Sequence, residues 1–347
     1  MFFLSVWRNK IWLERKDGSN YMLAYIIRRC LYAIPIIIGV NLITFLLFFV
    51  WSSPDNMART ILGQKNITQE DIDNWKRDHS YNLPLFINFK ESGLSLFTQT
   101  IFFQKSVGLM FFNFGRSDRN NIDIGREIRR RIRPSLAIAI PTFIIALLVD
   151  ITFAMLVAYY RATYVDFWGV VICVIMMSIS MLFYIIGGQW LFGKMLRLFP
   201  ISGYDTGTNM FKFVVLPVVI GVIGGIGMAV RFYRTIFLEE VNKDYVRTAR
   251  AKGLSEGKVL FKHALKNAMI PILTNVVMTI PFLIMGSLLM ENFFAIPGLG
   301  SFTIDAIYAQ DFAIVRCMVY IGAILYIVGL LLTDISYTLV DPRIRLE

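Results

Sequence analysis

The run "LYAIPIIIGVNLITFLLFFVW" (residues 31–51) decides the class of fold. A helix needs about 20 mostly apolar residues to cross a hydrocarbon core roughly 30 Å thick. The run is too long for a signal-peptide core and shows no small-x-small cleavage site, so we expect a retained transmembrane helix. The 347-residue chain is 56% hydrophobic and 17% charged, whereas soluble domains average roughly 45–50% and ~25%. The composition therefore indicates a membrane protein.

Five further runs are long enough to cross a bilayer, which predicts an all-α polytopic membrane protein with six transmembrane helices. They cover residues 136–159, 167–192, 213–230, 273–290 and 312–332. A weaker run, residues 94–114, is interrupted by Lys105 and other polar residues, and we interpret it as an interfacial or loop segment. In the outer segment, Thr68 is placed to cap a helix with Glu70 and Asp71 in its first turn.

The distribution of Lys and Arg predicts the orientation. Six of these residues precede the first span, nine lie between spans four and five, and residues 291–311 contain none. Short cytoplasmic segments carry the excess of positive charge, so residues 1–30 and the tail 333–347 are predicted to be cytoplasmic. Residues 52–134 then form an extracytoplasmic domain, because long segments are translocated largely regardless of charge. The net charge of +11 therefore reflects topology, and no nucleic-acid partner is expected.

Catalytic and metal-binding motifs are absent from the sequence. There is no phosphate-binding loop, zinc-protease motif or nucleophile elbow, and His79 and His263 lie far apart. Cys30, Cys173 and Cys317 have no metal-ligand spacing, and we interpret them as small core residues. The chain is predicted to be a non-enzymatic conduit without a cofactor or metal of its own. Energy for transport must then come from ions or from a partner.

Two polar residues inside the predicted spans are candidates for a translocation path, Asp150 and Asn41. A charge at mid-membrane costs about 2.5–3.5 kcal/mol on insertion scales, so Asp150 must face protein or water. One alternative is an ion-coupled secondary transporter that uses Asp150, and the other is a protonated or hydrogen-bonded aspartate in the bundle. Asn41 favours an interhelical hydrogen bond. Gly221 and Gly225 form a small-xxx-small pair that favours close helix packing.

A basic segment interrupts the apolar pattern: "DYVRTARAKGLSEGKVLFKHALKNAMIP", residues 244–271, called the basic hairpin below. Apolar spacing predicts one helix over residues 237–252, Gly253 suits a helix end with positive φ, and Ser255 can cap a second helix. The second helix carries two stripes, one basic and one apolar: Lys258, Lys262 and Lys266; Leu260, Ala264 and Ala268.

Three functions remain open for the basic hairpin on these grounds. It could lie on a leaflet with its lysines toward headgroups, dock in a groove of a partner protein, or anchor nucleic-acid- or lipid-handling proteins. The small residues near its bend favour docking, because a helix on a membrane usually presents bulky apolar side chains. They are Thr248, Ala249, Ala251 and Gly253.

The same residues carry a family resemblance. "DYVRTARAKGLSEGKVLFKHALKNAMIPILT" resembles the cytoplasmic coupling-loop signature of binding-protein-dependent ABC importer permeases, in particular the B-type subunit of the oligopeptide/dipeptide/nickel type. "YMLAYIIRRCLYAIPIIIGVNLITF", "ENFFAIPGLGSFTIDAI" and "DISYTLVDPRIRLE" are similar to other parts of that family. The resemblance implies a type I ABC importer permease architecture, with a permease core over residues 135–341 and a coupling loop over residues 231–272.

The resemblance also implies a function and partners. The chain would form half of a translocation path for peptides in a bacterial inner membrane, with nickel or another small solute as the alternative substrate. A second homologous permease, two ABC ATPase subunits that use ATP and Mg, and an extracytoplasmic solute-binding protein would complete the importer, in contact with membrane lipid. The residues implied to couple to the ATPase are Arg247, Thr248, Ala249, Arg250, Ala251, Lys252, Gly253 and Leu254; those implied to face the binding protein are Pro297, Gly298 and Gly300.

The sequence departs from the family's pattern in places. Residues 1–20 extend beyond its usual start, and Arg247 stands where the general coupling signature has Glu. Gln310 replaces a usual Arg, and Asp150 has no counterpart in the pattern.

Overall fold

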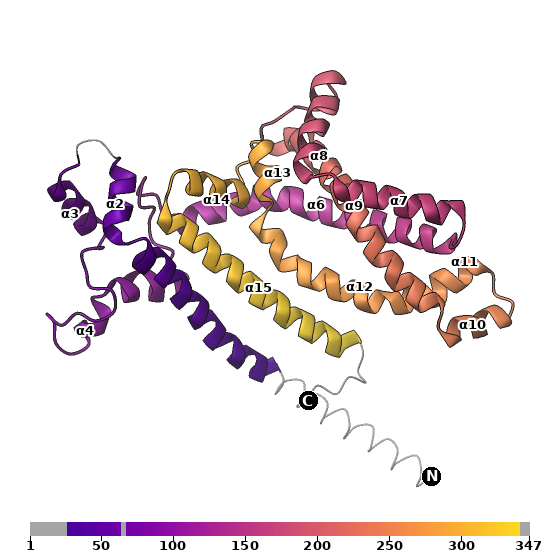
Figure 1. Ribbon diagram of the computed structural model, residues 1–347, viewed down its shortest axis with the longest axis horizontal. Coiled ribbons are helices and arrows are strands. Elements are labelled where there is room, and N and C mark those ends of the chain that lie inside the picture. Colours follow the sequence, from indigo (N-terminus) through magenta and orange to yellow (C-terminus); the bar gives the residue numbers. More distant parts are fainter. Residues whose placement is uncertain (1–25, 64–66, 341–347) are drawn as a thin grey trace, which may run out of the picture. The chain divides into compact units, whose positions relative to one another are not determined.

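A computed structural model describes residues 26–63 and 67–340 of the chain, and within these ranges every regular element is helical (Figure 1). Five helices are long and apolar enough to cross a membrane, and a sixth candidate is a sharply bent pair. This agrees with the predicted all-α polytopic class. The extension at residues 1–20 and the "DPRIRLE" ending lie outside the described residues. The chain divides into two compact units, Met1–Asp118 with Arg316–Glu347, and Arg119–Val315.

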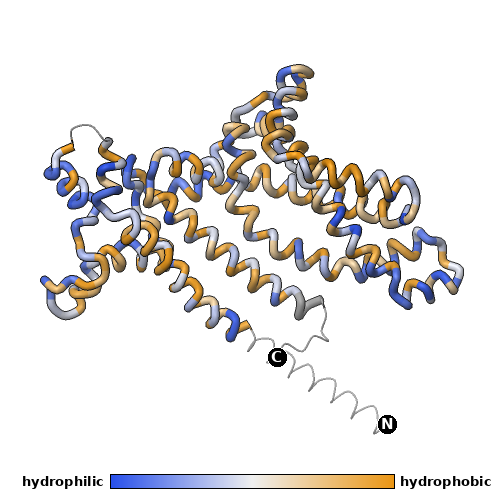
Figure 2. The backbone as a smooth tube through the Cα atoms, viewed as in Figure 1, coloured by the Kyte–Doolittle hydropathy of each residue, from blue (hydrophilic) through white to orange (hydrophobic). Residues whose placement is uncertain are grey.

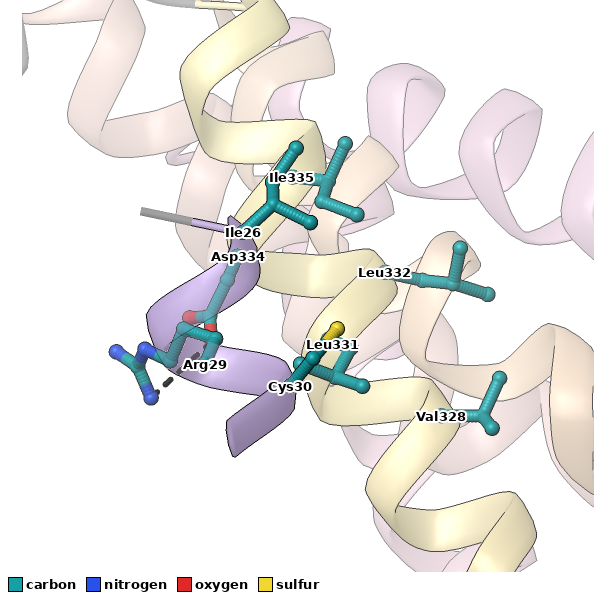
Figure 3. A pocket seen from close by; sticks show the side chains of 8 residues that line it. All are labelled: Ile26, Arg29, Cys30, Val328, Leu331, Leu332, Asp334 and Ile335. Carbon is teal, nitrogen blue, oxygen red and sulfur yellow. Dashed lines mark ion pairs between the residues drawn. The ribbon is translucent and has the colours of Figure 1, made fainter. Parts of the chain in front are cut away.

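The first unit contains the first predicted span as the helix Ile26–Trp51 and most of the last helix, α15 (Phe312–Val340). Figure 3 shows the two helices side by side, with an ion pair of 3.2 Å between Arg29 Nη1 and Asp334 Oδ2. An apolar crevice of about 230 Å³ lies beside this pair. Cys30 lines the crevice and is exposed, so its interpretation as a core residue is wrong, whereas Cys173 and Cys317 are buried.

A small helical region follows the first span in the same unit. Its elements are α2 (Pro54–Leu62), α3 (Gln69–Asp78), α4 (Ser95–Thr98), the π-helical η2 (Phe102–Val107) and α5 (Gly108–Met110). The predicted cap at Thr68 is confirmed, since its hydroxyl accepts the Asp71 N–H and the Asp71 carboxylate accepts the Thr68 N–H. Hydrogen bonds from Thr68 hold the pKa of Asp71 below its ordinary value.

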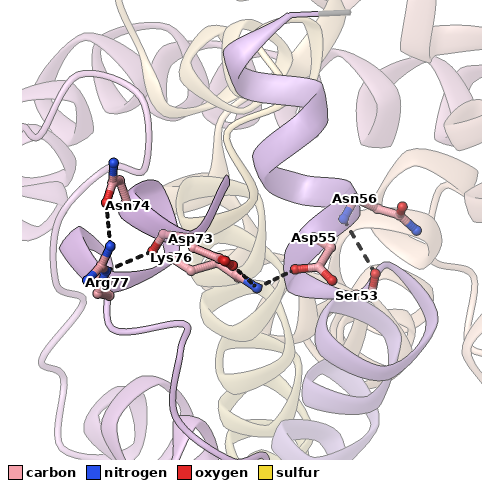
Figure 4. A network of polar contacts seen from close by, with 7 residues as sticks. All are labelled: Ser53, Asp55, Asn56, Asp73, Asn74, Lys76 and Arg77. Carbon is pink, nitrogen blue, oxygen red and sulfur yellow. Dashed lines mark hydrogen bonds and ion pairs between the residues drawn. The ribbon is translucent and has the colours of Figure 1, made fainter. Parts of the chain in front are cut away.

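A bridging lysine joins two of these helices. Lys76 Nζ lies 2.7 Å from Asp55 of α2 and 2.9 Å from Asp73 of α3 (Figure 4). These two carboxylates raise the pKa of Lys76. Residues 94–114 form only short helices, so the prediction that they are not a span is confirmed.

The second unit is built on α6 (Ile124–Tyr159) and α9 (Met210–Val241), which pack along each other. Helix α6 begins well before the predicted start at residue 136, because the Asp123 side chain caps it by accepting the Arg126 N–H at 2.8 Å. The expected glycine pair in α9 is only half correct. Gly221 is close-packed, so that an added Cβ would lie 2.9 Å from Thr142, but Gly225 faces open space. Gly224, packed against Met181, and Gly227, packed against the Cys173 carbonyl, make the other close approaches of α9.

Two predicted spans are not continuous helices. The third is α7 (Tyr164–Ser178) followed by α8 (Met181–Gly188) and a π-helical extension to Met195, with a bend of 88°. The fifth is α12 (Leu265–Thr279), a 3₁₀ segment (Ile280–Met285) and α13 (Leu288–Phe293). Gly286 has φ +68°, which lies outside the helical region, so a helix cannot continue through it. The residues on both sides of each break are apolar, so the hydropathy pattern did not reveal where the helices end.

Candidate functional site

The basic hairpin begins with a break that the sequence analysis missed. The single helix predicted over residues 237–252 is wrong, because α9 ends at Val241 and α10 (Asp244–Ala251) starts after an extended Lys243. Glu240 stabilises this corner, since its carboxylate accepts hydrogen bonds from both Lys243 Nζ and Tyr245 OH. Burial and the Glu240 contact raise the pKa of Tyr245 to about 12, so the phenol stays protonated and donates. Figure 2 shows the hairpin as a largely hydrophilic stretch beside apolar helices.

The bend at Gly253 is a Schellman motif, which confirms the predicted helix end. Gly253 has φ +75°, its N–H donates to the Arg250 carbonyl at 2.9 Å, and the Leu254 N–H donates to the Ala249 carbonyl at 3.4 Å. The following helix, α11 (Glu256–Lys258), starts after Ser255. The predicted capping bond from Ser255 is not formed among the described residues. Instead, Arg250 holds Glu256 through two hydrogen bonds of 2.7 and 3.1 Å, which links the two helices of the hairpin.

The two predicted stripes of the second helix are confirmed. Lys258, Lys262 and Lys266 are exposed. Leu260, Ala264 and Ala268 are buried. The helix runs on through a π-helical segment, Val259–Ala264, into α12. One side of the hairpin is therefore held by apolar packing and the other is free for water, headgroups or a protein.

The eight residues expected to couple to an ATPase fall into two groups. Ala249 is buried with Val246 and Val259 in a small core, and Leu254 packs against that core. The other six are exposed: Arg247, Thr248, Arg250, Ala251, Lys252 and Gly253. The small size of Ala249 therefore serves packing within the hairpin, and the exposed six are the residues available to a partner.

Polar contacts connect the base of the hairpin to neighbouring helices. Arg161, just beyond α6, donates to Asn242 at 2.9 Å. Arg234 of α9 and Asp166 of α7 form an ion pair of 2.6 Å. These contacts tie the segment before α10 to α6, α7 and α9.

A cavity of about 390 Å³ lies among the long helices of the second unit. Its walls come from α6, α8, α9, α12 with the 3₁₀ segment, and α13; they include Thr142, Met181, Gly221, Phe282 and Met290. Most lining side chains are apolar, and the Thr142 hydroxyl is buried without a hydrogen-bond partner among the described residues. The cavity combines apolar walls with a few polar groups, which is typical of small-ligand sites.

A buried carboxylate that the sequence analysis missed borders this cavity. Glu291 is 1% exposed, and its oxygens accept hydrogen bonds from the N–H groups of Gly300 (2.7 Å), Ser301 (3.1 Å) and Ser287 (3.3 Å). These donors include the first turn of α14 (Leu299–Tyr308), where a negative charge is favourable. The only signal in the sequence was an acidic residue at the end of an apolar run.

Ser135 of α6 completes what we call the Glu291 cluster: Ser135, Gly286, Ser287, Glu291, Gly298, Gly300 and Ser301. The Ser135 hydroxyl hydrogen-bonds with the Glu291 carboxylate and accepts the Leu299 N–H at 2.7 Å. Gly298 and Gly300, which were expected to face a binding protein, are buried in this cluster, and of the three residues in that prediction only Pro297 is exposed. Any Cβ atom at Gly298 would collide with the Glu291 carboxylate.

The two candidates for a translocation path belong to different compact units, and each is described by itself. Asn41 donates to the Ser106 carbonyl at 2.8 Å, which is the predicted hydrogen bond between helical segments. Asp150 is 5% exposed, and its Oδ1 atom has no hydrogen-bond partner among the described residues. It lies close enough to Cys173 and Tyr233 to interact with them electrostatically. A role of either residue in transport stays a prediction.

Comparison with known proteins supplies the family. Residues 150–346 match the family described as "Binding-protein-dependent transport system inner membrane component", and residues 22–139 match its N-terminal companion. The chain belongs to this permease family. It is therefore a multi-pass membrane protein, and the basic hairpin, the cavity and the Glu291 cluster all lie wholly or mainly within the matched residues.

Several relatives of this permease cover nearly the whole chain. The oligopeptide transport system permease protein AppB of Bacillus subtilis is 31% identical over 347 residues, which cover 93% of this chain and 100% of the relative. The dipeptide transport system permease protein DppB of Alkalihalophilus pseudofirmus is 30% identical over 350 residues, with 93% and 100% covered. The probable peptide ABC transporter permease protein y4tP of Sinorhizobium fredii is 30% identical over 328 residues, with 92% and 99% covered.

Proposed function

We propose that this permease imports peptides as one of two membrane-spanning subunits of an ATP-driven transporter. The names of the relatives that cover nearly the whole chain support a peptide substrate. The cavity in the second unit suits such a cargo, because apolar walls accept varied side chains while groups such as Thr142 can hydrogen-bond a peptide backbone. An uptake assay with di- and oligopeptides and with nickel separates the two substrate classes.

The partners belong to the same proposal. Two ABC ATPase subunits would bind ATP and Mg at the face that carries the basic hairpin, and a solute-binding protein would deliver peptide on the opposite side. A second, homologous permease would close the cavity into a path. This arrangement places both termini in the cytoplasm of a bacterial cell, and protease accessibility of terminal tags in sealed vesicles tests that orientation.

The observation that carries the proposal is the exposed face of α10. Six of the eight residues expected to couple to an ATPase, in α10 and the turn after it, are exposed. The packing of Ala249, the Schellman turn and the Arg250–Glu256 ion pair hold the helix in place within the hairpin. A docking helix must be rigid, because force from a moving partner would otherwise deform the helix instead of the spans. Differential contact of this face with the ATPase in two states would then shift the permease between conformations.

Ala251→Trp tests this docking face without disturbing the hairpin's own packing, because Ala251 is exposed. In proteoliposomes with the ATPases and binding protein, we expect peptide uptake to fall at least tenfold, which corresponds to about 1.4 kcal/mol. Lys262→Trp, on the exposed basic stripe of the same hairpin, is the matched control and should retain uptake. Normal ATP-coupled uptake by the Ala251 variant would overturn the docking proposal.

A further inference from the structure

Residues 86–112 of the first unit, called the arm below, expose several large apolar side chains outside the predicted spans. Phe89 and Leu94 are each 84% exposed and Phe111 is 81% exposed. The remaining strongly exposed members are Phe97, Phe103 and Phe112. A cluster of exposed large apolar residues within one short segment is a candidate interaction site.

The position of the arm along the first span sets its depth. Asn41 of the Ile26–Trp51 helix donates to the Ser106 carbonyl at 2.8 Å. One turn further along, the Phe45 ring packs against Phe102 at 5.0 Å and against Phe86 at 5.1 Å between centroids. Asn41 precedes the helix end at Trp51 by ten residues, which is about 15 Å of helix. The η2 segment therefore lies well below the end of the first span.

The apolar length of the first span gives the depth of the η2 segment in the bilayer. About 20 residues are needed to cross the hydrocarbon core, so nearly the whole run from Leu31 to Trp51 must lie inside it. A segment that contacts Asn41 and Phe45 is then at the depth of acyl chains. We propose that the arm is a re-entrant element that enters the leaflet on the Trp51 side, and that its exposed aromatic face binds lipid acyl chains.

The backbone of the arm satisfies the main condition for entering lipid. Unpaired backbone groups are costly in a bilayer, and the chain folds back here so that residues 84–88 pair with residues 96–102. The Ile101 N–H donates to the Pro84 carbonyl at 3.0 Å, the Phe102 N–H donates to the Leu85 carbonyl at 3.1 Å, and Asn88 donates to Leu96 at 2.9 Å. The short helices α4, η2 and α5 add backbone hydrogen bonds over residues 95–98 and 102–110.

The charged residues of the arm are placed to avoid lipid. The arm contains three of them, Lys90, Glu91 and Lys105. Lys105 Nζ lies 4.7 Å from the centre of the Tyr81 ring, which is buried, so its ammonium is directed into the protein and not into lipid. Lys90 and Glu91 are adjacent and exposed between Phe89 and Leu94. This segment therefore belongs at headgroup level, and the part of the arm that enters the leaflet is the remainder, residues 95–112.

Depth-dependent fluorescence quenching tests the proposal. In a chain whose three cysteines are replaced by alanine, Phe97→Cys and Phe111→Cys are labelled with an environment-sensitive dye in the assembled transporter in nanodiscs. Glu70→Cys, on the exposed face of polar helix α3, is the matched control. We expect acyl-chain-brominated lipids to remove most of the emission at positions 97 and 111 but not at position 70, and iodide in water to do the reverse.

Either of two results would overturn the arm's assignment to lipid. Quenching of positions 97 and 111 by iodide alone would place the aromatic face in water. Protection from both quenchers would place it against another protein subunit. Retained peptide uptake by the labelled chains shows that they are folded, and the quenching result stands independently of whether the ATP-driven function is correct.

Discussion

The basic hairpin and the Glu291 cluster are both glycine-containing turns of the second unit, and they treat charge in opposite ways. In the hairpin, Arg250 and Glu256 pair with side-chain exposures of 39% and 49%, and the remaining basic groups face outward. In the cluster, one carboxylate at 1% exposure is bound entirely by backbone N–H groups and Ser135. Charge in the hairpin is thus available to a partner, whereas the carboxylate of the cluster is enclosed by hydrogen bonds within the fold. Substitutions that conserve size but change charge should separate these two uses.

The largest expected effect comes from Glu291→Gln. The amide NH₂ would face either the Ser287 N–H or the N–H groups of Gly300 and Ser301, so at least one of these donors loses its acceptor. Loss of hydrogen bonds to a buried charged group should cost about 3 kcal/mol. Thermal unfolding in detergent, followed by fluorescence size-exclusion chromatography, measures this. Glu256→Gln in the exposed pair is the control, and an equal loss there would erase the distinction between the two regions.

Next in size is Gly298→Ala. The added methyl group collides with the Glu291 carboxylate, whereas a methyl group at Gly257 of the hairpin meets nothing within 4 Å. Overpacking of this kind costs about 1–3 kcal/mol, so the melting temperature of the Gly298 variant should fall while that of Gly257→Ala stays near the wild type. Two unchanged melting curves would mean that the cluster is not close-packed.

Substitution of Gly253 at the bend of the hairpin should have a smaller effect on stability. Gly253 has φ +75° but open space around it, so Gly253→Ala carries only the cost of placing an L-residue in the left-handed region, roughly 1–2 kcal/mol. We expect a small fall in melting temperature together with a reduced ratio of peptide uptake to ATP hydrolysis, measured in proteoliposomes. A normal ratio would show that the geometry of the bend is not needed for coupling.

The Tyr245–Glu240 contact predicts a weak dependence on pH. The folded-state pKa of Tyr245 is raised to about 12, above the ordinary value near 10. Its contribution to stability is therefore complete below pH ~10 and lost as the pH rises toward ~12. Melting temperatures between pH 7 and 11 should show a steeper alkaline fall for the wild type than for Tyr245→Phe, and parallel curves would contradict the assignment.

Asp150→Asn has the smallest expected effect. If the buried carboxyl group only packs in the bundle, ATP-driven uptake should stay within about twofold of the wild type, because the amide is nearly isosteric. Measurement of uptake with and without a proton gradient checks this. Abolished uptake with intact ATPase binding would instead support the ion-coupled role considered for Asp150.

Periodicity and local chemistry predicted much of this architecture, and the failures have a common cause. Lys258 and Leu260 stand on opposite stripes that the structure confirms, and Gly253 carries the predicted positive φ. The bend between α7 and α8 was not predictable, since residues on both sides are equally apolar. The Glu291 cluster depends on Ser135, which lies 156 residues away in sequence, and one sequence cannot show that such residues meet.

The pairing of the first and last helices has a consequence for biosynthesis. Arg29 at the base of the first helix meets Asp334 near the end of the chain, and the first unit is built from residues before Asp118 and after Arg316. A ribosome adding about 5–20 residues per second needs roughly 10–40 s to make residues 119–315, which separate the two parts of the first unit. During that interval the first helix waits in the membrane without its final neighbour. Newly made chains that lack α15 should therefore be the ones that quality-control proteases recognise.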